Sequence, residues 1–169
     1  LEATFLTKRI AKLLLYEPPL QDRIDLAVVG RIEEMIKDGN REEAVTTFLR
    51  QVVMVSPSEL DAMRSRPAWS RLIDSIDSQP RQLRALAAYR FDAQRTRTRS
   101  VETLLIRGSE SANPDIRRAM NSLMASLPNR TEVVLEGQQH NAMDTGREQL
   151  AAAIADFLLG TADESAQKR

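Results

Sequence analysis

Three short apolar runs, separated by helical patterns, most constrain the fold of this chain. They are Ile10–Tyr16, Val101–Ile106 and Thr131–Leu135. Strands buried on both faces of a parallel sheet have nearly continuous apolar sequences, whereas half-exposed strands alternate. Alternating strands and helices further imply parallel pairing through right-handed crossovers. We therefore predict an α/β fold with three parallel strands and flanking helices.

Helices are predicted before the first run, between the second and third, and after the third. Their ranges are Leu1–Thr7, Asn113–Leu127 and Arg147–Leu159. Asn113 precedes a proline and suits the start of a helix, and Gly160 suits the end of one. Thr145 and Glu148 have the spacing of a capping box.

A long helical block separates the first two strands. Residues from Gln21 to about Tyr89 predict four or five short helices with no strand, and the polar, basic stretch Arg90–Ser100 is interpreted as a linker. Asn40 with Glu43, and Ser56 with Glu59, have capping-box spacing. The predicted organisation is a helix end and strand over 1–20, a helical lid or cap insertion over 21–99, two strands with helices over 100–160, and a frayed tail over 161–169.

Composition excludes several classes of function. The 169 residues include no cysteine, which excludes disulfides, thiolate metal sites and a cysteine nucleophile. The 24 basic and 24 acidic residues give a net charge of zero, so no overall charge attracts nucleic acid. No apolar run approaches the ~18 residues that would predict a membrane span, and no secretory signal is visible. A cytoplasmic location is expected.

His140 is the single histidine, and it follows the third strand in a short loop. Functional groups of open α/β sheets gather beyond the carboxyl ends of the strands, and imidazole suits a general base near neutral pH. Glu17 follows the first strand and Glu110 the second, so either carboxylate could orient the ring. The alternatives are a packing histidine and solvated loop acids. Asp115 and Asp144 are weaker candidates, because acids are favoured at helix starts for other reasons.

Three segments together resemble the α/β-hydrolase superfamily, and its bacterial esterase-like members most closely. They read LLLYEPP at 13–19, TLLIRG at 103–108 and VVLEGQQHNAM at 133–143. The resemblance implies that the three strands correspond to the sixth, seventh and eighth strands of that fold. It also places the helical block where the family has its variable lid.

By this resemblance His140 is the catalytic base of a Ser-His-acid triad. The family acid usually lies three residues after the glycine that ends the seventh strand, a position that Ser111 occupies here, with Glu110 one residue short. Other members place the acid after the sixth strand, which corresponds to Glu17. The commoner arrangement slightly favours Glu110.

The resemblance also shows what this sequence lacks. The G-x-S-x-G signature of the nucleophile elbow does not occur, and Leu1–Ala3 resembles the helix that follows the elbow. Ser109 and Ser111 are poor substitutes, because neither is on an elbow-like turn. The expectation is an esterase-type hydrolase of a small-molecule substrate in the complete protein, without a metal or cofactor, and inactive as this chain alone.

Two other readings remain open. One is a haloalkane or C–C bond hydrolase on the same fold, since a fold does not determine a reaction. The other is a non-catalytic interaction module built on a truncated hydrolase scaffold. The strand Leu13–Tyr16 is expected to form an exposed apolar sheet edge, and such edges recruit other strands. The expected partner of that edge is a missing N-terminal half or a second copy of the chain.

Overall fold

The computed structural model describes residues 1–20, 24–111 and 113–160, and the chain divides into two compact units. The first unit contains Leu1–Pro18 and the chain from Asp92 onward, and the second is Pro19–Phe91. The second unit is thus inserted in the sequence between two parts of the first. The predicted tail at 161–169 and the predicted start of the helical block at 21–23 lie outside the described residues.

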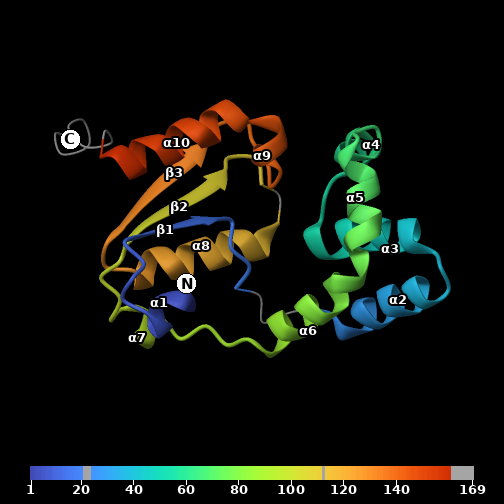
Figure 1. Cartoon of the computed structure of the whole chain (residues 1–169), viewed down its shortest axis with the longest axis horizontal. Coiled ribbons are helices and arrows are strands. Elements are labelled where there is room, and N and C mark those ends of the chain that lie inside the picture. The colour runs from blue at the N-terminus through green and yellow to red at the C-terminus, as the bar shows by residue number, and fades with distance from the viewer. Residues whose placement is uncertain (21–23, 112, 161–169) are drawn as a thin grey trace. The chain divides into compact units, whose positions relative to one another are not determined.

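The first unit is built on a three-stranded parallel sheet (Figure 1). Its strands are β1 (Lys12–Tyr16), β2 (Glu102–Gly108) and β3 (Arg130–Leu135), in the order β1-β2-β3. The register aligns Tyr16 of β1 with Ile106 of β2, and Ile106 with Val133 of β3. The predicted parallel sheet is therefore confirmed, and the carboxyl ends of all three strands lie at one edge.

The central strand, β2, is buried on both faces. Leu104 and Ile106 belong to a core cluster with Phe157, and Leu105, between them in sequence, is fully buried as well. Successive side chains of a strand point to opposite faces, so both faces of β2 must be covered. Figure 1 shows α10 and α8 on opposite sides of the sheet. This double covering explains why the sequence of β2 is nearly continuously apolar.

The helices of the first unit follow the predicted pattern with two differences. The helices of this unit are α1 (Ala3–Leu6), α7 (Ala93–Thr96), α8 (Pro114–Ser126), α9 (Ala142–Thr145) and α10 (Arg147–Leu159). As predicted, the Asn113 side chain caps α8 and Gly160 ends α10, with a φ of +76°. The interpretation of 90–100 as a plain linker was wrong, because α7 lies within it.

The predicted capping box at the start of α10 was also wrong. Thr145 ends α9, and its hydroxyl donates to the Gln138 side chain at 2.8 Å. Gly146 is the residue before α10, and no side chain caps that helix. Thr145 therefore lies one residue before the position that could cap α10, and its hydroxyl donates to Gln138 and to the Asn141 carbonyl.

The second unit consists of helices and their connecting turns, with no strand in its described residues. It contains α2 (Leu26–Lys37), α3 (Arg41–Phe48), the π-helical turn η1 (Leu49–Val53), α4 (Pro57–Arg64), α5 (Ala68–Ser75), the 3₁₀ turn η2 (Ile76–Ser78) and α6 (Gln79–Ala88). Fully buried residues, among them Ile32, Val45 and Ile76, join these helices in one core. The predicted cap at Ser56 is confirmed, whereas the Asn40 side chain makes no capping hydrogen bond.

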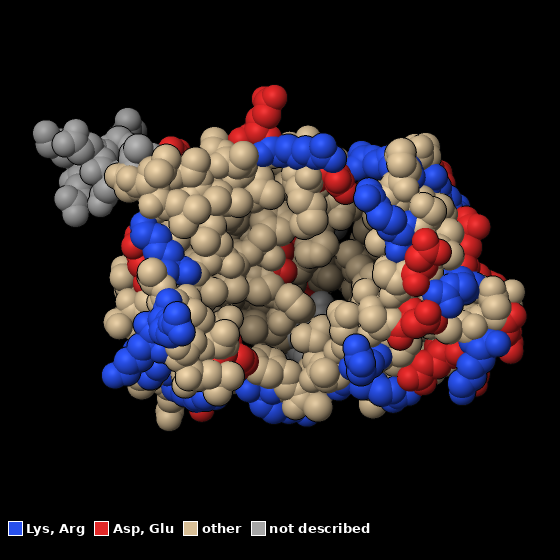
Figure 2. Space-filling model, in the orientation of Figure 1, with Lys and Arg blue, Asp and Glu red and all other residues tan. Residues whose placement is uncertain are grey.

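Two further features bear on the predictions about membranes and charge. Within the described ranges, no helix has the length and apolar character needed to cross a membrane. On the face drawn in Figure 2, each unit shows both basic and acidic side chains.

Gly108, the last residue of β2, tests how tightly the strand ends are packed. A Cβ at Gly108 would lie 2.2 Å from the Gln138 carbonyl oxygen, a backbone atom that cannot rotate away. We expect Gly108→Ala to destabilise the protein by about 1–3 kcal/mol, as overpacking does. A Cβ at Gly30 in α2 would meet no described atom within 4 Å outside its own helix backbone. Gly30→Ala should therefore stabilise the protein by about 0.5–1 kcal/mol. Urea unfolding followed by circular dichroism measures both, and unchanged stability of Gly108→Ala would contradict this packing.

Candidate functional site

The loops that follow the three strands meet at the carboxyl edge of the sheet. Glu17 directly follows β1, Ser109 to Ser111 follow β2, and His140 lies in the loop between β3 and α9. Because parallel strands all end at one edge, residues far apart in the sequence come together there. Glu17 and His140, separated by 123 positions, are in direct contact.

The central contact of the site joins imidazole and carboxylate. His140 Nδ1 lies 2.7 Å from Glu17 Oε2. The Glu17 side chain is fully buried, whereas the His140 side chain is 36% exposed. An ionised carboxylate only accepts hydrogen bonds, so a neutral imidazole in this contact carries its proton on Nδ1. Its Nε2 then keeps a lone pair that can accept a proton.

The second oxygen of Glu17 is held by the last residue of β2 and by the loop that follows it. Oε1 accepts a hydrogen bond from the backbone N–H of Gly108 at 2.8 Å and another from the Ser111 hydroxyl. The backbone N–H of Glu17 donates to the Ile106 carbonyl at 3.0 Å. Glu17 has a φ of +39°, a left-handed conformation that is uncommon outside glycine. Such conformations persist only where the surroundings hold them, and here main chain and side chain are both held.

These contacts determine the ionisation of Glu17. Burial alone would raise the pKa of this carboxyl, because it disfavours the charged form. The hydrogen bonds from His140, Ser111 and Gly108, together with the charge of a protonated His140, outweigh burial and lower the pKa of Glu17 below its ordinary value. The carboxylate is therefore charged near neutral pH although it is buried.

Tyr16 fixes the loop that carries His140. Its hydroxyl donates to the Gln139 carbonyl at 2.5 Å and accepts from the Ala142 N–H at 3.4 Å. Its ring stacks on the imidazole, with centroids 6.1 Å apart. This role of Tyr16 was not predicted from the sequence. The signal available in the sequence was the position of Tyr16 at the end of an apolar run, next to Glu17.

Glu110 occupies a different environment from Glu17. It is exposed, and its backbone N–H donates to the Gln138 carbonyl at 2.9 Å. Within the described part of the chain, its side chain makes no hydrogen bond or ion pair with His140. The Ser109 hydroxyl accepts from the Gly137 N–H at 2.8 Å. The structure thus brings together His140 and Glu17, and not His140 and Glu110.

The weaker acidic candidates form local ion pairs. Asp115 pairs with Arg118 within α8, and Asp144 pairs with Arg147 at 3.3 Å. Both acids belong to the first turn of their helices, where an acid favours the helix in any case. Over residues 1–20, 24–111 and 113–160, no group of three or more His, Asp and Glu side chains is arranged to hold a metal ion.

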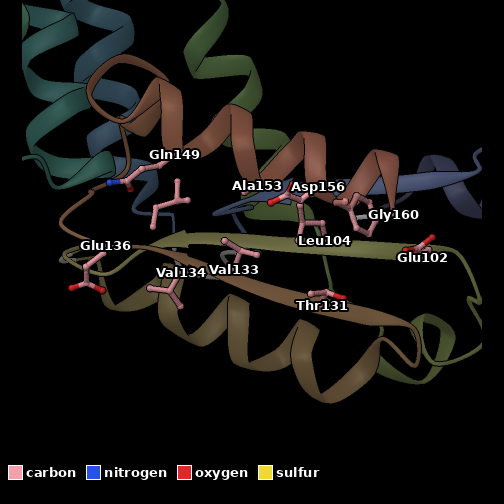
Figure 3. Close-up of a pocket in the computed structure, with 12 residues that line it drawn as sticks. Glu102, Leu104, Thr131, Val133, Val134, Glu136, Gln149, Ala153, Asp156 and Gly160 are labelled. Carbon is pink, nitrogen blue, oxygen red and sulfur yellow. The ribbon is translucent and has the colours of Figure 1, made fainter. Parts of the chain in front are cut away.

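A cleft of about 570 Å³ lies between α10 and the sheet, and it does not include the His140–Glu17 pair (Figure 3). Its apolar lining includes Leu104, Val133 and Phe157, and its acidic lining includes Glu102, Glu136 and Asp156. These residues come from β2, β3 and α10, except Glu136, which directly follows β3. The candidate site is therefore defined by the contacts at the strand ends and not by this cleft.

Comparison with known proteins identifies the fold. No protein-family model matches the sequence, and no curated protein matches it. Among solved structures, an α/β hydrolase from Sphaerobacter thermophilus is similar over 88% of this chain, with a TM-score of 0.73 and 24% identity. An α/β-hydrolase enzyme from a Medee basin deep-sea metagenome library is similar over 92%, with a TM-score of 0.62 and 18% identity. A proline iminopeptidase from Mycobacterium smegmatis is similar over 90%, with a TM-score of 0.54 and 16% identity.

The chain therefore has an α/β-hydrolase fold, as predicted. It spans 58% of the length of the first two structures and 59% of the third. Because each structure is longer than this chain, the chain corresponds to part of that fold.

The lowered pKa of Glu17 predicts how stability depends on pH. A proton binds this carboxyl less readily in the folded than in the unfolded state, so folding gains stability above the unfolded pKa. That stability is lost as the pH falls from about 4.5 through the lower folded pKa. We expect Glu17→Gln to be less stable than wild type at pH 7, with the difference shrinking below about pH 4.5. Urea titrations across this range measure it, with Glu110→Gln as the matched control. A constant difference would contradict the assigned hydrogen bonds.

Tyr16 supplies a separate prediction. Tyr16→Phe keeps the ring but removes the hydroxyl that joins Gln139 and Ala142. We expect a loss of about 0.5–1.5 kcal/mol of stability and faster hydrogen exchange at the Ala142 N–H. Native-state exchange measured by NMR tests this prediction. Unaltered exchange at Ala142 would show that the hydroxyl does not fix the loop.

Proposed function

We propose that this chain provides the base and the acid of a Ser-His-acid triad in a hydrolase that acts on an ester-like bond of a small molecule. One observation supports this proposal most: His140 Nδ1 lies 2.7 Å from a buried carboxylate, at the carboxyl ends of parallel strands. The α/β-hydrolase fold of the chain agrees with it. Base and acid come from the loops after β3 and β1.

The proposed chemistry assigns one role to each nitrogen of the ring. Nε2 of His140 accepts the proton of a serine hydroxyl while that oxygen attacks the ester carbonyl carbon. Glu17, hydrogen-bonded at Nδ1, stabilises the imidazolium that forms. The ring then gives the proton to the leaving alcohol oxygen as the carbon–oxygen bond breaks. Water attacks the acyl-enzyme in a second round of the same proton transfers.

The serine is proposed to lie in a part of the fold that this sequence does not contain. The sequence has no G-x-S-x-G motif, and the similar solved structures are longer than this chain. The oxyanion hole uses the backbone N–H that follows the nucleophile. Without nucleophile and oxyanion donors most rate enhancement is lost, so this chain alone is expected to be inactive.

We assign the acid to Glu17 in preference to Glu110. Glu17 is buried and contacts the imidazole, whereas Glu110 is exposed. A buried carboxylate is unfavourable unless hydrogen bonds compensate its lost hydration, and three donors do so here. The helical unit Pro19–Phe91, which begins two residues after Glu17, is proposed to be the lid that selects the substrate.

Two alternative functions can be tested by the same experiments. A haloalkane or C–C bond hydrolase would use the same histidine on a different substrate. A non-catalytic interaction module is favoured by one observation: in the described part of the chain, β1 pairs with β2 alone and leaves its other edge without a strand. Open edges of this kind recruit further strands.

A serine-directed fluorophosphonate probe tests the proposal on the full-length protein that its gene encodes. Wild type should be labelled, and His140→Ala should abolish the labelling. Glu17→Gln should slow labelling by about 10⁴-fold, the size of effect that replacing a triad carboxylate by its amide has.

Glu110→Gln is the matched control, since it makes the same change in the neighbouring loop. It should label within about twofold of wild type, because surface substitutions change little. Slow labelling of Glu110→Gln with normal labelling of Glu17→Gln would reverse the assignment of the acid. A full-length protein that contains the elbow but takes up no probe would contradict the hydrolase proposal and favour the interaction module.

A further inference from the structure

We infer that Ser111 is a positioning residue: its hydroxyl, together with the Gly108 backbone N–H, holds one oxygen of Glu17 so that the other oxygen faces His140. This inference rests on the proposed function, because it concerns how the proposed acid is aimed. It extends that function by assigning a role to a side chain that does not contact the imidazole.

The two oxygens of Glu17 have separate partners. Oε2 contacts His140 Nδ1, whereas Oε1 accepts from Gly108 and Ser111. The terminal torsion of a glutamate is intrinsically broad, and its other torsions each have several staggered states. Two donors on one oxygen remove that freedom, because a rotation of the carboxylate breaks both hydrogen bonds. The imidazole then meets an acceptor whose direction is already fixed.

The two donors differ in how firmly they are placed. The Gly108 N–H belongs to the end of β2, and its position is fixed by the sheet. The Ser111 hydroxyl reaches Glu17 from the loop after that strand. Ser111 thus holds the Glu17 carboxylate from a second direction. Its side chain can be replaced without altering β2.

Charge explains why the second donor matters. The fully buried Glu17 carboxylate has one ion-pair partner in the described residues, His140, which is charged only when protonated. While His140 is neutral, the negative charge is balanced by dipoles alone, those of the Nδ1–H, the Gly108 N–H and the Ser111 O–H. Hydrogen bonds to charged groups contribute more than neutral ones, so loss of the hydroxyl is a substantial fraction of that balance.

Threonine and valine form a nearly isosteric pair of substitutions for testing Ser111. Thr keeps the hydroxyl of Ser111, and Val has nearly the same shape as Thr but no hydroxyl. If Ser111→Ala fails to fold, the comparison of Ser111→Thr with Ser111→Val still isolates the hydrogen bond. Both variants add a methyl group at Cβ and have nearly the same volume, so a packing defect would affect them similarly.

The readout is the tautomer of His140, which is the only imidazole in the chain and gives an unambiguous ¹⁵N NMR spectrum. At a pH where the ring is neutral, wild type and Ser111→Thr should carry the proton on Nδ1. Ser111→Val and Ser111→Ala should shift population toward the Nε2–H form, which Glu17→Gln should populate most. In the full-length protein, Ser111→Val should slow labelling by the fluorophosphonate probe about tenfold, and Ser111→Thr should restore the wild-type rate.

Each outcome has a distinct meaning. If Glu17→Gln changes the tautomer and Ser111→Val does not, the positioning role of Ser111 is wrong and the proposed function stands. If Glu17→Gln leaves the tautomer unchanged, Glu17 does not hold the ring and the proposed function itself fails. Equal effects of Ser111→Thr and Ser111→Val would show that shape matters at this position and the hydroxyl does not.

Discussion

The buried carboxylate of Glu17 is the group on which the candidate site depends. A carboxylate that leaves water must recover its lost hydration from hydrogen bonds, or it becomes neutral. Here the compensation comes from the end of β2, from the loop that follows it and from the loop that follows β3. One charge therefore requires three segments of the chain to be placed together, and this requirement orders the edge of the sheet where chemistry is proposed.

The fold meets that requirement through the geometry of parallel strands. The ends of β1, β2 and β3 are aligned by their register, which brings Tyr16, Ile106 and Val133 side by side. The Glu17 backbone then turns into the left-handed region, and its N–H remains bonded to the Ile106 carbonyl. Close approach of the Gln138 backbone leaves room for no side chain at Gly108. The site is thus an extension of the sheet and not an independent loop structure.

Much of this architecture was predictable from the sequence, because it depends on local pattern. The apolar runs located the strands, and helices α8 and α10 begin and end close to their expected residues. His140 was named as a candidate base from its position after a strand. Glu17 was named as one of two acids, but the commoner motif slightly favoured Glu110. The sequence does not disclose that Glu17 is buried, nor that its backbone turns to a φ of +39°.

Two contacts at the site that escaped prediction join residues far apart in the sequence. Ser111 and Glu17 are 94 positions apart, and Tyr16 and Gln139 are 123 apart. The capping box at Thr145 failed for a local reason: Gly146 is the residue that precedes α10, and the Thr145 hydroxyl donates to Gln138 and Asn141 within the preceding loop and turn. Local spacing shows what a side chain can do nearby, and the fold determines which distant group competes for it.

The hydrogen bond between Glu17 and His140 is most directly tested by the ¹H NMR signal of the imidazole N–H. A proton held between Nδ1 and a buried carboxylate exchanges slowly with water and resonates far downfield of the amide protons. We predict one such signal, coupled to Nδ1 in protein labelled with ¹⁵N-histidine and absent when Gln replaces Glu17. A spectrum without this signal, or a signal that survives the replacement, would contradict the contact on which the account is built.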